Sequence, residues 1–179
     1  AEIAERLAWP NSLAGNFSTR GYYGTLSHNA KSIYQRYVGW YDGNPANLEP
    51  LPPTERATKM ISYMGGIDVA ISRAREDFHR GEYRWVAEIM NAAVFADPSH
   101  TEARALCADA FEQLGYQTES ATWRNAYLLG AQELRHGAPK MMRSAVRPDI
   151  VAAITMEQFF DYLAIRIDVD REARTIVIQ

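Results

Sequence analysis

The pattern of apolar and polar positions predicts that most of the chain is helical. After residue 53, apolar residues return every three or four positions in five successive segments. These segments are Thr54–Met64, Ile67–Arg80, Tyr83–Ala96, Ser99–Gly115 and about Glu119–His136. Glycines or an Asp-Pro step separate them, which is typical of helix ends. The sequence therefore predicts a mostly α fold of stacked antiparallel helical hairpins.

The apolar positions of these segments define an expected core. Its members are Ile67, Ala70, Ile71, Ala74, Phe78, Val86, Ile89, Met90, Ala93, Ala103, Leu106, Ala110, Phe111 and Leu114. Two helix starts are also expected from their side chains. Ser99 and Glu102 are spaced as a capping box, and Thr118 precedes the last segment as a cap.

An internal period supports the hairpin interpretation. Three pairs of small residues lie 34 positions apart: Ala74 and Ala108, Gly81 and Gly115, and Ala87 and Ala121. Small residues at helix crossings and glycine at the turn, repeated at this period, are typical of tetratricopeptide-like helix pairs. An ordinary antiparallel bundle is the alternative interpretation of the same matches.

The first 53 residues are less regular. We expect a short helix over Ala1–Trp9, a loop over Asn11–Gly24 and a helix over Asn29–Val38. The apolar stripe of that last helix consists of Ala30, Ile33, Tyr34 and Tyr37. Four prolines and two glycines exclude a helix from Gly39–Pro53, which is expected to be a connector lying against a surface.

The C-terminal part has a different pattern. Thr155 and Gln158 are spaced as a capping box, and the helix they begin is expected to turn Phe159, Leu163 and Ile167 inward. Arg174–Gln179 alternates as a strand does. A single strand cannot satisfy its own backbone N–H and C=O groups, so we expect either a second molecule beside it or a domain whose other strands are absent.

Composition and motifs narrow the possible functions. The net charge of −3 gives no overall attraction to nucleic acid or anionic membrane. No apolar run could span a bilayer, and the first residues lack the features of a signal peptide. Cys107, the single cysteine, excludes an intrachain disulfide and is expected to lie in the core.

Local metal and catalytic motifs are also missing from the sequence. The four histidines are His28, His79, His100 and His136, and no two lie within five residues of each other. They therefore form no short metal-binding pair, and the last three are expected at the surface. There is no Walker loop, GxSxG or GxGxxG sequence.

One stretch carries possible chemistry. Residues 20–29 read RGYYGTLSHN, with two glycines flanking Tyr22 and Tyr23. Arg20 offers a forked cation suited to an oxyanion, and His28 and Asn29 stand at a helix start, whose amides also favour an anion. The stretch is thus a candidate half of an oxyanion pocket. The alternative is that its tyrosines, with those of residues 34–41 and Trp40, form an aromatic seam between helices or subunits.

Longer strings of the sequence resemble a known family. RGYYGTLSHNAKSIYQRYVGWYDGNPANLEPLPP, YMGG, GEYRWVAEIMNAAVFADP and AFEQLGYQTESATWRNAYLLGAQELRHG together span about residues 20–137. They resemble the bacterial alkyl sulfatases of the metallo-β-lactamase superfamily. Such enzymes hydrolyse alkyl sulfate esters, such as dodecyl sulfate, to an alcohol and sulfate.

The resemblance implies a domain organisation. It implies that residues 1–44 are the tail of a zinc-dependent catalytic domain and that residues 45–137 form a helical domain that joins two copies as a homodimer. After a linker at 138–144, residues 145–179 would begin a domain similar to sterol carrier proteins. The family's HxHxDH motif for two zinc ions does not occur in this chain, so the resemblance implies that the chain alone binds no zinc and is inactive.

The resemblance also assigns roles within RGYYGTLSHN. Tyr23 or Tyr22 corresponds to a sulfate-contacting tyrosine, and Arg20, His28 and Asn29 are further candidates for the sulfate side. Two other functions stay open from the residues alone. One is a non-catalytic helical-repeat scaffold that binds a partner peptide; the other is lipid binding around Phe159 and Leu163.

Overall fold

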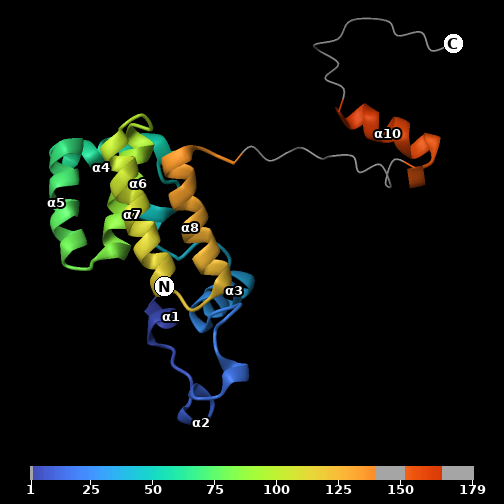
Figure 1. The fold of residues 1–179 in the computed structure, drawn as a ribbon, viewed down its shortest axis with the longest axis horizontal. Helices are drawn as coiled ribbons and strands as arrows, with labels where there is room; N and C mark the ends of the chain where they lie inside the picture. Colours follow the sequence, from blue (N-terminus) through green and yellow to red (C-terminus); the bar gives the residue numbers. More distant parts are fainter. Residues whose placement is uncertain (1, 140–151, 167–179) are drawn as a thin grey trace, which may run out of the picture. The chain divides into compact units, whose positions relative to one another are not determined.

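The computed structural model describes residues 2–139 and 152–166, which belong to two separate compact units divided between Pro139 and Lys140 (Figure 1). Every regular element in these two ranges is a helix. The mostly α fold predicted from the sequence is therefore confirmed. None of the helices in the described ranges combines the length and apolar character that a bilayer span requires.

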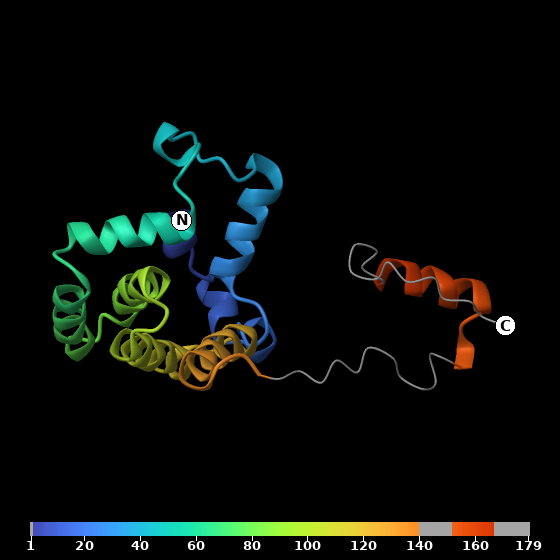
Figure 2. The same ribbon diagram turned by 90° about the horizontal axis from the view of Figure 1, so that it is seen from above.

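Five helices form the body of the first unit, and their bounds agree closely with the predicted segments. They are α4 (Pro53–Tyr63), α5 (Ile67–His79), α6 (Tyr83–Ala96), α7 (Thr101–Gln117) and α8 (Ala121–His136). Helix α6 packs against α4, α5 and α7, and α8 packs along α7 (Figure 2). The chain thus forms an array that is centred on α6 and extended by α8.

The core of this array contains the predicted side chains. Buried positions include Ala70, Ile71, Ala74, Val86, Ile89, Met90, Ala93, Ala103, Leu106 and Ala110. The larger Ile67, Phe78, Phe111 and Leu114 are partly buried and pack against them. Most of the buried residues of the array are alanines. Because these side chains are small, the helix axes can approach closely and the helix backbones pack against each other.

Residues 2–51 form an arm attached to this array. It contains α1 (Glu2–Arg6), α2 (Asn11–Ala14), a 3₁₀ turn (Phe17–Thr19), α3 (Leu26–Val38) and a second 3₁₀ turn (Pro45–Asn47). The loop predicted for Asn11–Gly24 was wrong in part, because it holds α2 and the first turn. A local hydrogen bond stabilises that turn, because the Asn16 side chain accepts from Ser18 N at 3.1 Å. Such a turn forms without a periodic pattern of apolar residues, so that pattern did not predict it.

Helix caps differ from the sequence expectations. The Ser99 hydroxyl bonds Asp97 Oδ1 at 2.6 Å, and the cap of α7 is His100, whose Nδ1 accepts from Ala103 N at 3.3 Å. The predicted Ser99 capping box was therefore wrong. Thr118 does not cap α8 either, because its hydroxyl donates to Leu114 O at 2.6 Å at the end of α7. Ser120 occupies the cap position of α8 instead.

The structure does not confirm the 34-residue repeat. Gly81 lies in a turn with φ of +82°, whereas Gly115 lies inside α7, so the predicted helix end at Gly115 was wrong. Ala87 is buried while its counterpart Ala121 is exposed. Only the pair of Ala74 and Ala108 is buried at both positions. One of the three matches therefore lies at a helix contact, and the tetratricopeptide-like repeat stays a prediction.

The described part of the second unit centres on α10 (Met156–Arg166). Its predicted capping box is confirmed: Thr155 N donates to Gln158 Oε1 at 3.0 Å, and Gln158 N donates to Thr155 Oγ1 at 3.2 Å. Phe159 and Leu163 are half-buried. Ile167 and the predicted strand Arg174–Gln179 lie outside the described residues.

Candidate functional site

The candidate stretch is a tight turn that leads into α3. A Cβ on Gly21 would lie 3.0 Å from Gly24 O, so a side chain at this position would crowd the backbone of the turn. Thr25 then caps α3, its Oγ1 accepting from His28 N at 2.9 Å. Helix α3 therefore begins at Leu26, three residues earlier than the sequence predicted, and includes His28 and Asn29 in its first turn.

The carbonyl groups of the turn are bound by the start of α8. Ala121 N donates to Tyr22 O at 2.6 Å. Tyr23 O accepts from Ser120 Oγ at 2.9 Å and from Thr122 Oγ1 at 2.6 Å. The first N–H groups of a helix have no partner within the helix, so the turn satisfies one of them. Ser120 is completely buried at this contact.

A charged pair lies beside these bonds. Arg20 Nε donates to Glu119 Oε1 at 2.6 Å, and this hydrogen bond raises the pKa of the Arg20 guanidinium above its ordinary value. The same guanidinium lies 5.8 Å from the centre of the Tyr22 ring, which also packs against Phe17 at 5.0 Å. Arg20 is thus fixed in place by a carboxylate and an aromatic ring.

The imidazole of His28 contacts the next residues of α8. Trp123 Nε1 donates to His28 Nδ1 at 3.0 Å, and the two rings meet edge to face with centres 5.9 Å apart. Lys31 Nζ, nearly one turn further along α3, lies 5.8 Å from the Trp123 ring centre. Trp123 therefore contacts two cationic or titratable side chains of α3.

The structure brings most of the predicted site residues to one place. Arg20, His28 and the backbones of Tyr22 and Tyr23 all contact residues 119–123, which we call the α8 start. The Tyr23 side chain is 82% exposed and that of Tyr22 is 41% exposed. The Asn29 side chain does not join this group but lies near Gly24.

Sequence reasoning missed the α8 start. Its residues are Glu119, Ser120, Ala121, Thr122 and Trp123. Serine and threonine before an apolar helix indicate a helix cap, and this signal was assigned to Thr118. No local pattern reports a contact between positions that are about 95 residues apart along the chain.

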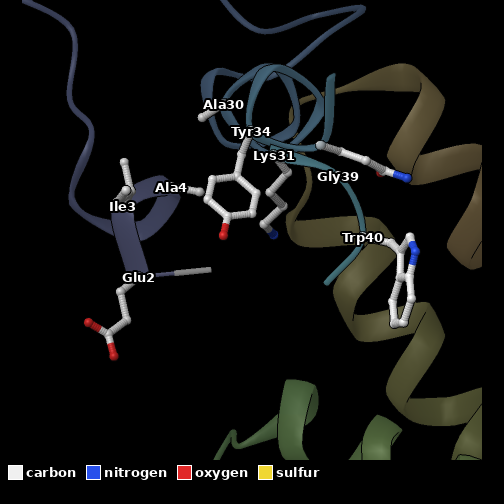
Figure 3. A pocket seen from close by; sticks show the side chains of 9 residues that line it. Glu2, Ile3, Ala4, Ala30, Lys31, Tyr34, Gly39 and Trp40 are labelled. Atoms are coloured by element: carbon white, nitrogen blue, oxygen red, sulfur yellow. The ribbon is translucent and has the colours of Figure 1, made fainter. Parts of the chain in front are cut away.

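A hollow of the first unit lies next to this group rather than within it. Its volume is about 640 Å³, and it lies between α1 and α3, where Tyr34 and Lys31 point toward α1 and Trp40 borders the far side (Figure 3). Lys31 thus links the hollow with Trp123. The lining is mainly apolar, with one cation in reach.

Other candidate groups have no catalytic arrangement. Cys107 is buried on α7, and burial raises the pKa of its thiol to about 12. Within residues 2–139 and 152–166, no three histidine, cysteine or acidic side chains gather closely enough to hold a metal ion.

A family model for alkyl sulfatase dimerisation matches residues 1–137. The chain therefore belongs to the alkyl sulfatase dimerisation family. The boundary predicted at residue 44 lies inside this match, and it stays a prediction.

Similar proteins are named as sulfatases. The chain is 56% identical over 177 residues to the alkyl/aryl-sulfatase BDS1 of Saccharomyces cerevisiae, covering 99% of this chain and 27% of that protein. It is 49% identical to an (R)-specific secondary-alkylsulfatase of a Pseudomonas species, covering 95% and 26% of the two chains. The solved structure of the stereoselective inverting sec-alkylsulfatase Pisa1 from Pseudomonas superposes with a TM-score of 0.82 at 49% identity, covering 95% and 27%.

The chain spans about a quarter of the length of these relatives. They include a yeast protein, so the resemblance is not confined to bacteria.

Proposed function

We propose that this chain is part of an alkyl sulfatase that hydrolyses alkyl sulfate esters, such as dodecyl sulfate, to an alcohol and sulfate. The observation that carries the proposal is the match of residues 1–137 to the alkyl sulfatase dimerisation family, together with 56% identity to a sulfatase over nearly the whole chain. In this proposal the chain supplies dimerisation and one edge of the sulfate pocket.

The sulfate edge is formed by Tyr23, Tyr22, Arg20, His28 and Asn29. The fixed positions of Arg20 and His28 beside the α8 start support this, because a binding group is effective when its orientation is set before the ligand arrives. The metal is proposed to be a pair of zinc ions of the metallo-β-lactamase type, held by residues outside this chain. The second unit is proposed to begin a domain similar to sterol carrier proteins.

The test is an assay of sulfate release from dodecyl sulfate by the complete polypeptide and by this chain alone. We expect the complete polypeptide to release sulfate and to contain two zinc ions per copy by elemental analysis. The isolated chain should do neither. Sulfate release by the isolated chain would show that the catalytic groups lie within it, and a complete polypeptide inactive on all alkyl sulfates would contradict the proposed activity.

The resemblance implied that residues 45–137 join two copies, and we propose that the arm, residues 2–51, adds to that surface. Ala4 is the only buried residue of the arm, yet α3 is amphipathic and carries Ile33, Tyr37 and Val38 at 57–84% exposed. Helix α1 covers part of α3, and no other helix within residues 2–139 makes comparable contact with it. Exposed apolar surface of this kind marks an interaction site. A second copy is the favoured occupant because the family match includes the whole arm.

The scaffold alternative has one observation in its favour. Arg84, Glu88 and Asn91 lie along the exposed side of α6 and line a groove of about 320 Å³ that Tyr127 also borders. Polar side chains on an inner face are what a peptide-binding repeat presents. Arg84, however, is already held by Glu5 of α1, at 3.2 Å, so the groove contacts the arm of the same chain. Dimerisation therefore remains the better-supported function.

A further inference from the structure

We propose that Trp123 is a positioning residue for the sulfate site: its indole N–H holds the His28 imidazole so that Nε2–H is the available donor. This inference rests on the proposed function, because it assumes that His28 lies at the sulfate edge. It adds a residue of the helical array to the groups that set the geometry of the site.

The tautomer of the neutral His28 imidazole follows from the hydrogen bond. The indole nitrogen of Trp123 can only donate, so His28 Nδ1, 3.0 Å away, has to accept with its lone pair. A neutral imidazole that accepts at Nδ1 carries its proton on Nε2. The edge-to-face contact of the two rings, at 62° and 5.9 Å, restrains rotation of the imidazole. Both the proton's position and the ring's orientation are therefore set by one side chain.

The chemistry suits an anionic ligand. An Nε2–H group donates to an oxyanion, and the Lys31 ammonium lies nearly one turn further along α3, over the same indole ring at 5.8 Å. Trp123 thus orients a neutral donor and holds a cation on one helix. Arg20, at the other side of the turn, is a second cation and is paired with the Glu119 carboxylate at 2.6 Å.

The position of Trp123 is itself fixed relative to the turn. The three residues before it, Ser120, Ala121 and Thr122, bind the carbonyl groups of Tyr22 and Tyr23. The backbone of His28 is fixed separately by Thr25. Only rotation of the His28 side chain then remains unrestrained, and the hydrogen bond from Trp123 restrains it.

The first part of the test is spectroscopic and does not depend on activity. In the uniformly ¹⁵N-labelled chain at pH 8, where imidazole is ordinarily neutral, we expect a through-hydrogen-bond coupling between Trp123 Nε1 and His28 Nδ1. The His28 signals are assigned by their loss in His28→Asn. Finding the His28 proton on Nδ1, or no coupling, would overturn the proposal.

The second part uses the complete polypeptide and dodecyl sulfate. Trp123→Phe keeps an aromatic ring but removes the donor, and we expect kcat/KM to fall by about tenfold, the effect of one lost hydrogen bond. Trp85→Phe, an exposed tryptophan on α6, is the matched control and should leave kcat/KM unchanged. Melting temperatures of both variants should stay near that of the unmodified protein.

A double variant separates positioning from general structural support. If Trp123 acts through His28, Trp123→Phe in the His28→Asn background should have little further effect on kcat/KM. Effects that multiply would show that Trp123 acts independently and would overturn the proposal. A His28→Asn variant as active as the unmodified enzyme would also overturn it, while leaving the proposed sulfatase activity intact. An inactive unmodified polypeptide would instead contradict the proposed function, and the coupling would still decide the His28 geometry.

Discussion

At the residue scale, Gly115 shows how closely α7 and α8 approach. A Cβ at this position would lie 2.9 Å from Leu128 Cδ2 and 3.0 Å from its Cγ. The branched carbons of valine would extend further into the same space, so we expect Gly115→Val to lower the free energy of unfolding by about 1–3 kcal/mol. Urea unfolding followed by circular dichroism measures this change.

The control for this variant is Ala105→Val, which places the same side chain on the exposed face of α7. It should cost only the small helix-propensity difference, roughly 0.6 kcal/mol. Equal losses in the two variants would mean that Gly115 is not a close-contact position.

Burial of Cys107 predicts a pH dependence of stability. The unfolded thiol loses its proton around its ordinary pKa of 9.0, whereas the folded thiol keeps it to about 12. The stabilisation is therefore complete below pH 9 and is lost as the pH rises toward 12. We expect the free energy of unfolding to fall by about 1 kcal/mol more between pH 8 and pH 10 in the unmodified chain than in Cys107→Ala. An identical fall in both proteins would show that the buried thiol does not contribute.

Residue-scale features differ in how well a sequence predicts them. The burial of Met90 and Ala93 was predicted correctly, because apolar period alone decides which face of a helix turns inward. The caps at Ser99 and Thr118 were predicted wrongly, because several neighbouring hydroxyl and imidazole groups compete for the same backbone N–H groups. Which one wins depends on the direction of the incoming chain.

At the element scale, the end of α8 is held by a side chain from α7. Arg104 donates from Nε at 2.9 Å and from Nη2 at 2.5 Å to Leu134 O, one of the last carbonyl groups of α8. Arg104→Met keeps the apolar stem but removes both donors, so we expect a loss of about 1.5–3 kcal/mol in the free energy of unfolding.

Arg73→Met, at an exposed position of α5, is the matched control and should change stability by less than about 0.5 kcal/mol. Hydrogen exchange adds a local readout, since the amides of the last turn of α8 should exchange faster in Arg104→Met. Unchanged exchange there would contradict the role assigned to Arg104.

For helix α3, the sequence predicted the helix but not what covers its apolar face. Its period correctly predicted a helix with Ala30, Ile33, Tyr34 and Tyr37 on one stripe, but the stripe is largely exposed in this chain. An amphipathic sequence pattern predicts that one face of a helix is apolar, but it does not predict which surface covers that face. The contact of His28 with Trp123 was unpredictable for a related reason, since it depends on how α8 crosses the arm.

At the scale of the whole molecule, the arm and the helical array differ in how completely each one is packed. The array has a core of buried apolar side chains, although Tyr63 on its surface is 96% exposed. Within residues 2–51 only Ala4 is buried, and Ile33, Tyr37 and Trp40 are 59–84% exposed. The arm has no such core, and its exposed apolar side chains gain stability only when they are covered. This difference fits a molecule in which the helical array positions the arm and the arm supplies an association surface.

This division predicts which substitutions separate two copies. Ile33→Lys with Tyr37→Lys places two charges on the exposed stripe of α3, and a buried charge without a partner opposes association. We expect the dimer dissociation constant to rise at least about a hundredfold, while the helical content of each copy stays unchanged. Sedimentation equilibrium of the chain at micromolar concentrations measures the constant. Tyr63→Lys on α4, at 96% exposed the most accessible of the aromatic side chains described, is the control and should leave it unchanged. If Tyr63→Lys separates the copies and the α3 variant does not, then the two copies meet through the array and not through the arm.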